Sequence, residues 1–294
     1  MFINEVRKAT NLTKKAIEYY TSQGLVSPAI LENGYRDFSE NDVALLKRIS
    51  VFRKIGLGME DIKAVLADDK ESVIQKISVK KELSIQREKA KQVLLDRLST
   101  GESLAEIETA LNAIEQNKTV TDKLLEAFPG YYGRFLCLHF ARFLNEPIST
   151  PQQQAAYNEI IEFLDEAPAL IFSKELRDFL DENTQGISVE NIQEINEKTK
   201  RSIENPEQFL SENKEMLAWY FEYKKSDEYK NSAAFKIQKM LKEFNNTSGY
   251  YDVFIPAMKR LSTSYAKHCQ QLETANEKLL SEYPEIAILN NQIK

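Results

Sequence analysis

Cysteine, histidine, glycine and proline are all scarce in this chain of 294 residues, which holds two Cys, two His, nine Gly and eight Pro. Two cysteines cannot form the disulfide framework of a secreted protein, so we expect a reducing, cytoplasmic location. No run of about 20 apolar residues is present to span a membrane. The first residues lack the basic and apolar regions of a signal peptide. The shortage of turn-forming residues favours an all-helical chain.

The same shortages exclude several classes of enzyme and metal site. Neither of the phosphate-binding patterns GxGxxG and GxxxxGK[ST] occurs, and no paired acids or nucleophile stand out. A Cys₂His₂ site is arithmetically possible from Cys137, His139, His268 and Cys269. Residues one or two positions apart on a helix do not face one point, however, which argues against zinc. We therefore expect no enzyme, no cofactor and no metal, and place these four side chains in helix cores.

Charge is distributed unevenly along the chain, whose net charge is −6. Residues 1–58 hold nine Lys and Arg against six acids, and residues 59–127 hold eleven against fourteen. Residues 128–294 hold nineteen against twenty-five. This pattern has two explanations, ordinary variation of surface charge or a basic N-terminal domain that contacts phosphates. The charge distribution alone does not distinguish them.

Residues 3–23 show the pattern of two short helices joined by a turn. A first helix stops near Asn11, and Thr13 can cap a second helix that starts at Lys14. Apolar residues at spacings of three and four form the expected inward face, namely Val6, Ala9, Leu12, Ala16 and Tyr20. The outward side chains are then Lys14, Lys15, Glu18 and Thr21. This is the helix-turn-helix pattern.

The stretch from Leu25 to Phe38 is expected to be non-helical, and its Asn33-Gly34 pair is a strong hairpin signal. A two-stranded ribbon that follows a helix-turn-helix is a wing. The segment Ser39-Glu40-Asn41-Asp42 predicts the capped start of the next helix. The buried stripe of that helix is Val43, Leu46, Ile49 and Phe52, and a further short helix is expected over residues 59–67.

From residue 71 to about residue 98 the chain contains no Gly or Pro, which predicts a helix of about 28 residues, roughly 42 Å long. Such a helix must pack against something, and Leu94 and Leu98 near its end are candidate dimer contacts. After a break at residues 99–102, spacings of three, four and three predict a coiled-coil seam of Leu104, Ile107, Leu111 and Ile114. An intramolecular helical hairpin is the alternative use of this seam.

The rest of the chain predicts six or seven further helices and no strand. The expected breaks lie at residues 147–151, Pro168, residues 184–186, residues 205–206, residues 245–249 and Pro284. The expected fold is therefore all-α dominated, with a small β-wing, a long helix and a C-terminal helical bundle. The expected domain bounds are residues 1–70, 71–127 and 128–294.

The first seventy residues resemble the DNA-binding head of the MerR family of transcription regulators. The order and spacing of five segments carry this resemblance: Ile3-Asn4-Glu5-Val6, Asn11-Leu12-Thr13, Tyr19-Tyr20-Thr21-Ser22-Gln23-Gly24-Leu25, the segment Asn33 to Asp42, and Phe52-Arg53-Lys54-Ile55-Gly56-Leu57. The resemblance implies a winged helix-turn-helix that dimerises through the long helix in an antiparallel coiled coil. The domains are then a winged helix-turn-helix DNA-binding domain (1–70), a dimerisation helix with its connecting helix (71–127) and an all-helical effector-binding domain (128–294). The resemblance also implies binding to double-stranded DNA at promoters with an over-long spacer. When an effector binds, the regulator distorts this DNA so that RNA polymerase can read both promoter elements.

Seven side chains are the predicted DNA contacts: Thr13, Lys14, Lys15, Glu18, Tyr19, Tyr35 and Arg36. The two lysines lie on the outer face of the recognition helix, and the tyrosine hydroxyls can donate to phosphate oxygens. Arg36 follows the Asn-Gly turn, where a wing reaches the DNA backbone. Glu18 departs from the family, which commonly has Arg there; a carboxylate can accept from cytosine N4 but repels phosphate.

The family's metal sensors and cofactor-binding members do not fit this chain. An iron–sulfur sensor needs four cysteines, residues 71–130 contain no cysteine for a thiolate site, and the family's cobalamin-binding pattern is absent at both histidines. An organic small-molecule effector is left. Helical spacing places Trp219, Glu222 and Tyr223 together, an aromatic wall with a carboxylate that suits a cationic, lipophilic ligand. The alternative is that these aromatic residues form core. Further candidates are the Gly-Tyr-Tyr residues Tyr131, Tyr132, Tyr250 and Tyr251.

The sequence thus predicts a dimeric MerR-like regulator that senses an organic molecule through its helical domain. The alternative is a winged-helix DNA-binding protein whose helical body binds a protein partner. A third possibility, an enzyme fused to a DNA-binding head, has no supporting residues.

Overall fold

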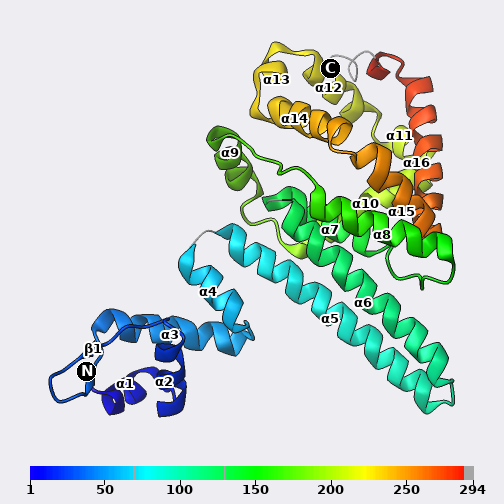
Figure 1. Ribbon diagram of the computed structural model, residues 1–294. Coiled ribbons are helices and arrows are strands. Elements are labelled where there is room, and N and C mark those ends of the chain that lie inside the picture. The colour runs from blue at the N-terminus through cyan, green and yellow to red at the C-terminus, as the bar shows by residue number, and fades with distance from the viewer. Residues whose placement is uncertain (69–70, 129, 288–294) are drawn as a thin grey trace. The chain divides into compact units, whose positions relative to one another are not determined.

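The computed structural model describes residues 1–68, 71–128 and 130–287 (Figure 1). The chain divides into two compact units, Met1–Ile77 and Ser78–Lys294. The domain boundary expected after residue 70 falls beside residues 69–70, which lie outside the described residues. No helix within the described ranges combines the length and the apolar character needed to cross a membrane. The expected fold class, all-α with a small β-wing, is confirmed.

The first unit contains the elements that the sequence predicts. Two short helices, α1 (Ile3–Thr10) and α2 (Lys14–Ser22), precede the antiparallel pair β1 (Ala29–Ile30) and β2 (Arg36–Asp37), in which Ala29 faces Asp37 and Ile30 faces Arg36. Helices α3 (Glu40–Ile55) and α4 (Met59–Ala67) follow. The ribbon β1–β2 is the expected wing.

The caps of these helices come from the residues that the sequence analysis assigned to them. The Thr13 hydroxyl accepts from the backbone N–H of Ala16 at 3.2 Å and starts α2. Ser39 and Asp42 form a reciprocal capping box at the start of α3, with N–H-to-oxygen distances of 3.1 and 2.9 Å. Gly56 ends α3 with a φ of +89°, a left-handed conformation that glycine adopts without strain.

The core of the first unit holds most of the apolar residues expected there. Its buried members are Val6, Ile17, Tyr20, Val26, Phe38, Val43, Leu46, Ile49, Leu57, Ile62, Val65 and Ile77. The prediction was wrong for Ala9, which is exposed, while Ile17 is completely buried. Asn11 has a φ of +56° between the two helices. The chain therefore changes direction there, and a helical period counted through the turn does not keep its phase.

The second unit begins within the long helix α5 (Glu71–Ser99), whose bounds match the prediction, and continues with α6 (Leu104–Ala127). Within this unit the two helices lie side by side as an antiparallel pair (Figure 1). Val79 and Leu83 of α5 share one buried cluster with Val120 and Leu124 of α6. A single chain thus forms the helical hairpin that the sequence analysis gave as the alternative, although this does not test the expected dimer.

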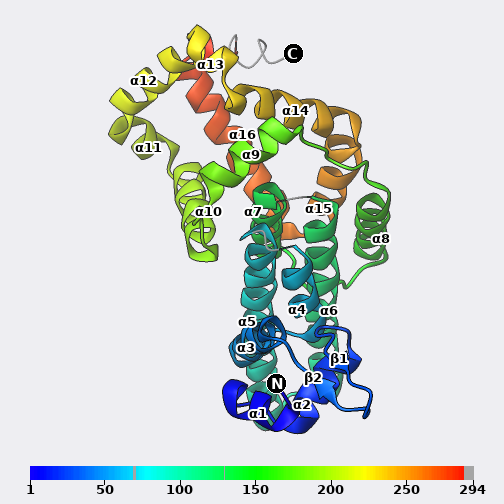
Figure 2. The same cartoon turned by 90° about the vertical axis from the view of Figure 1, so that its left-hand side faces the viewer.

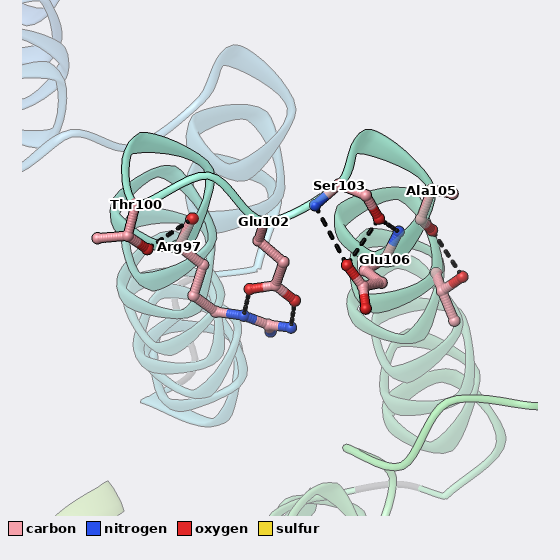
Figure 3. A network of polar contacts seen from close by, with 7 residues as sticks. Arg97, Thr100, Glu102, Ser103, Ala105 and Glu106 are labelled. Atoms are coloured by element: carbon pink, nitrogen blue, oxygen red, sulfur yellow. Dashed lines mark hydrogen bonds and ion pairs between the residues drawn. The ribbon is translucent and has the colours of Figure 1, made fainter.

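The turn between α5 and α6 is fixed by two polar pairs, which Figure 3 shows from close by. The Arg97 guanidinium donates to both oxygens of the Glu102 carboxylate. Ser103 and Glu106 form a capping box at the start of α6, where the backbone N–H of Ser103 donates to the Glu106 carboxylate at 3.1 Å. These contacts stop α5, start α6 and return the chain along itself.

The remaining helices of this unit are short and numerous. They are α7 (Gly130–Ala141), α8 (Pro151–Glu166), α9 (Lys174–Thr184), α10 (Val189–Glu204), α11 (Pro206–Glu212), α12 (Lys214–Lys225), α13 (Asp227–Asn231), α14 (Ala233–Thr247), the π-helical turn η1 (Tyr250–Phe254), α15 (Ile255–Leu261) and α16 (Thr263–Glu282).

This described part contains more helices than the six or seven expected, because the chain also breaks at Asn213, Ser226, Ser232 and Ser262. The three serines accept from the backbone N–H three residues later and so cap new helices without any glycine or proline.

The main core of the second unit lies where α6, α7, α8, α15 and η1 pack together, an arrangement that can be followed in Figure 2. Phe140 of α7 and Phe254 of η1 meet edge to face with ring centroids 5.0 Å apart. A smaller cluster of Leu210, Leu217, Phe221 and Ile286 joins α11, α12 and the end of the described chain.

Glu146 ties the segment after α7 to the start of α16. Its carboxylate accepts from the backbone N–H groups of Thr263 and Ser264 at 3.0 and 2.8 Å and from the hydroxyls of Ser262 and Ser264. Burial raises the pKa of this carboxyl, but these hydrogen bonds outweigh burial and lower the pKa to about 2. Glu146 is therefore an ionised N-terminal cap supplied from a distant part of the sequence.

Candidate DNA interface and effector site

A groove of about 600 Å³ in the first unit brings the second helix of the helix-turn-helix and the wing together. Four of the seven predicted DNA contacts line it, namely Lys14, Glu18, Tyr35 and Arg36. The groove is also lined by Phe2, Ile3, Asn4, Ile30, Asn33 and Gly34. The sequence analysis missed Phe2, Asn4 and Ile30. Ile30 could have been noticed as an apolar residue in the expected wing, where few residues can bury it. In the structure its side chain is 75% exposed.

The predicted contacts on α2 lie on its exposed side in three different settings. Lys14 Nζ lies 3.8 Å from Glu18 Oε1, an ion pair at the surface that water screens. Lys15 and Tyr19 are exposed but do not line the groove. The hydroxyl of Thr13 serves as the cap of α2. Glu18 thus partly neutralises the positive charge at the groove, the departure from the family that the sequence analysis noted.

The wing is held in shape by its own backbone, which leaves two side chains at its surface. Tyr35 accepts from the backbone N–H of Leu31 at 2.8 Å through its carbonyl, and its own N–H donates to Asn33 Oδ1 at 3.1 Å. Gly34 has a φ of +79°. The Tyr35 and Arg36 side chains are exposed, a position from which a hydroxyl and a guanidinium can reach phosphates.

Comparison with known proteins identifies this arrangement. Residues 1–69 match the family described as MerR HTH family regulatory protein. Residues 1–69 form a MerR-family helix-turn-helix domain. The resemblance inferred from the sequence is confirmed for this part of the chain.

Two relatives show how far the MerR-family domain carries the similarity. "Heavy metal-dependent transcription regulator 2" of Rhizobium meliloti (strain 1021) is 40% identical over 68 residues, which cover 23% of this chain and 46% of the relative. "HTH-type transcriptional regulator CueR" of Salmonella typhi is 39% identical over 62 residues, 21% of this chain and 45% of the relative. This chain therefore spans about half the length of the curated relatives it matches. No solved structure matches it significantly.

The predicted effector residues of α12 lie at the surface of the second unit. Trp219 is 67% exposed, so the alternative that it forms core is wrong. Its ring stacks on Tyr223 of the same helix, with centroids 5.6 Å apart and planes 2° apart. Glu222 is exposed and pairs with Lys225 at 2.7 Å. The helical spacing does bring the three side chains together, but the carboxylate already has a cationic partner.

Three of the four tyrosines of the Gly-Tyr-Tyr segments pack in or against the main core, and none of the four lies on α12. Tyr132 packs edge to face on Phe128 at 5.7 Å, and burial raises the pKa of Tyr132 to about 12. Tyr250 is buried, and burial raises its pKa well above the usual value. Tyr131 is partly buried and Tyr251 exposed. These positions place the four phenols apart from Trp219 and leave their role in effector binding a prediction.

The cysteines and histidines lie in the core of the second unit, as expected. Cys137, Cys269 and His268 are buried, and His139 is partly buried. The His139 and His268 rings lie edge to face with centroids 5.6 Å apart. Among the described residues, no group of three or more His, Cys, Asp and Glu could hold a metal ion.

His139 stays neutral because its surroundings oppose a proton. Burial lowers the pKa of His139 to about 3, with help from the positive charges of Arg142 and His268 and against a hydrogen bond with Asn196. Arg142 Nη2 lies 3.3 Å from His139 Nδ1. The neutral imidazole can therefore accept from the guanidinium through this nitrogen.

Acidification is expected to destabilise the second unit through His139. An unfolded chain protonates this histidine near pH 6.5, whereas the folded chain does so only near pH 3. Between these values the unfolded state binds more protons, so stability falls as the pH falls and is fully present above pH 6.5. At pH 5 the loss is about 2 kcal/mol. Urea unfolding at pH 7.5 and pH 5 measures it.

The matched variant is His139→Gln, whose side-chain oxygen can still accept from Arg142 but does not titrate. We expect it to lose less stability than the wild type between the two pH values. An equal loss in both proteins would contradict the assignment to His139.

Proposed function

We propose that this protein is a MerR-type transcription regulator that binds promoter DNA as a homodimer and responds to an organic small molecule held by its helical second unit. The observation that carries the proposal is the MerR-family domain, whose second helix and wing share one groove. By the logic of that family, the protein acts in the cytoplasm, and the effector changes promoter geometry for RNA polymerase.

Exposed apolar side chains on the α5–α6 hairpin support the homodimer. Leu95 is 59% exposed and Leu104 is 73% exposed, and Leu98 and Leu111, three and seven residues further along the same helices, are exposed too. Apolar surface concentrated in this way is typical of an interaction site. This apolar surface lies partly on the long helix α5, the helix through which the family resemblance implies dimerisation. We therefore expect a second copy of this chain to be the partner that covers it.

The organic effector is supported by the extent of the helical second unit, which the two relatives do not cover. The word "heavy metal-dependent" in one relative's name concerns that protein, and its match to this chain spans 68 residues. The surface formed by Trp219 and Tyr223 stays a candidate for a cationic, lipophilic effector, although binding there has to compete with the Glu222–Lys225 ion pair.

Replacing Arg36 by alanine is expected to weaken DNA binding nearly equally across sequences. The side chain is exposed beside the groove, so the change removes one phosphate contact and lowers the slope of log affinity against log salt by about one. The measurement is titration, at several salt concentrations, of a duplex that the wild-type protein selects from a random library.

Lys239→Ala is the control, because Lys239 is an exposed lysine of α14 in the second unit. It should leave the salt slope unchanged. An unchanged slope for Arg36→Ala would contradict the role of the wing, and failure of the wild-type protein to select any duplex would contradict DNA binding itself.

A further inference from the structure

A cavity of about 570 Å³ lies between α5, α6, α7 and α10 in the second unit, and the sequence analysis named none of its residues as candidates. Its volume falls within the roughly 300–1,000 Å³ that is usual for small-molecule sites. Leu83, Ala90, Ile114, Leu138 and Ala141 supply apolar surface. The polar lining consists of Gln86, Arg87, Asn117, Arg142, Asn145, Gln193, Asn196 and Glu197.

Two arginines of this lining have unsatisfied donors. Among the described residues, the buried Nη1 of Arg87 on α5 and the buried Nε of Arg142, directly after α7, have no hydrogen-bond partner. A buried donor without a partner costs free energy, and a guanidinium is recognised best by a planar or tetrahedral oxyanion. Both arginines line the cavity, and two cationic side chains with unsatisfied donors favour an anion as its occupant.

The rest of Arg142 is already held in place. Its Nη1 donates to the backbone carbonyl of Asn196 at 3.4 Å, its Nη2 lies 3.3 Å from His139 Nδ1, and its guanidinium carbon lies 4.6 Å from the centre of the Phe143 ring. These contacts orient the guanidinium before any ligand arrives, so little rotamer freedom is lost on binding. A guanidinium carries five N–H groups, so donors of Arg142 are left over for a ligand.

The charges around the cavity favour an anion over a cation. Glu197 is the only acid among the described residues that line it, and it is exposed, so water screens its charge. The amide side chain of Asn117 is engaged with the Ala141 carbonyl at 3.1 Å and with Asn145 Oδ1 at 2.8 Å. The two guanidinium groups outnumber the one lining carboxylate. Burial lowers the pKa of Arg142, while Glu197 and Glu204 both raise that pKa and so keep the guanidinium charged. The apolar wall accepts a hydrocarbon body.

We propose that this cavity binds a small organic anion whose carboxylate or phosphate group is held by Arg87 and Arg142 and whose apolar part packs on Leu83 and Leu138. That this anion is the effector rests on the proposed function; that the cavity binds it does not. This cavity lies apart from Trp219 in the sequence and on other helices, and its ligand carries the opposite charge to the cationic ligand expected at Trp219.

The test titrates the full-length protein with phenyl phosphate and with benzoate at constant ionic strength, followed by calorimetry. We expect saturable binding of one molecule per chain for at least one of them, and the preferred probe distinguishes a phosphate site from a carboxylate site. Inorganic phosphate should bind more weakly than phenyl phosphate, because it leaves the apolar wall uncovered. Arg87→Gln should weaken binding about tenfold or more by removing a charge-assisted hydrogen bond.

Arg201→Gln is the control, since Arg201 is an exposed arginine of α10 that does not line the cavity. It should bind the probe as the wild type does. Arg142→Lys keeps the charge but removes the Nε donor, and it should also bind more weakly. The proposal is overturned if neither probe binds saturably or if Arg87→Gln binds the preferred probe as tightly as the wild type.

DNA binding by the same proteins separates this proposal from the proposed function. Without a probe, Arg87→Gln should bind the selected duplex as the wild type does. Probe binding that leaves DNA affinity and promoter distortion unchanged supports the cavity and contradicts its role as an effector site. DNA binding that persists when neither probe binds overturns the cavity and leaves the DNA-binding function standing.

Discussion

Replacing Leu95 by aspartate is expected to convert the proposed homodimer into a monomer and to weaken binding to the selected duplex by about a hundredfold or more. Leu95 lies on α5 with more than half of its side chain exposed, so the charge does not enter the core of the single chain. In the proposed dimer the same position would be covered twice, once in each copy, and two carboxylates would lose their water there. A monomer reaches one half-site of the DNA instead of two.

Sedimentation velocity and duplex titration measure the two effects. Leu104→Asp, at an even more exposed position of α6, should act in the same direction. Ile171→Asp is the matched control, because Ile171 is 74% exposed in the second unit but lies outside the α5–α6 hairpin. An intact dimer in both hairpin variants would contradict an interface at this end of the hairpin.

Leu94, the dimer contact chosen from the sequence, is a poor test of this interface. Its side chain is only 7% exposed in the single chain, so an aspartate there would be buried within the folded monomer. Loss of the dimer in Leu94→Asp would then follow from unfolding of the hairpin. A substitution at Leu94 therefore tests the fold of the hairpin, whereas one at Leu95 tests the exposed surface.

Replacing Gly133 by alanine is expected to destabilise the second unit by at least about 3 kcal/mol. A Cβ atom on Gly133, in α7, would lie 1.9 Å from the carbonyl oxygen of Phe128 and 2.8 Å from its carbonyl carbon. These are backbone atoms and cannot rotate away as a side chain can. The Phe128 side chain is itself buried in the main core, so α7 and Phe128 have to separate within packed surroundings.

Thermal unfolding should show this as a fall in the midpoint of about 6–12 °C for a unit of this size. Gly58→Ala is the control, because the nearest atom to an added Cβ there is a carboxylate oxygen of Asp61 at 3.4 Å. Gly58 caps α4 with a φ of −69°, which alanine adopts freely, so only a small loss is expected. A Gly133→Ala protein as stable as the control would contradict the close approach of α7 to Phe128.

The DNA-binding part of the molecule could be predicted because its signals are local. Thr13 and Ser39 cap helices through N–H groups three residues away, and Asn33-Gly34 turns the wing within a few residues. Each of these choices depends on neighbours in the sequence, so the pattern of residues is enough to place the elements. Even here the spacing failed within α1, where Thr10, four residues after Val6, is buried and Ala9, three residues after it, is exposed.

The candidate ligand site could not be predicted, because residues far apart in the sequence form it. Arg87 lies on α5, Arg142 directly after α7 and Asn196 on α10, and nothing in their local sequence marks them as neighbours. Trp219 shows the opposite case: helical spacing correctly paired it with Tyr223, but only the packing of α12 decided that the pair faces solvent. The sequence by itself determined the helices and caps of the first unit, the extent of α5 and the family that residues 1–69 match, since hydrogen bonding and periodicity act over a few residues. The tertiary structure alone decided which side chains are buried and which charges share a cavity, since burial depends on contacts that close long loops of chain.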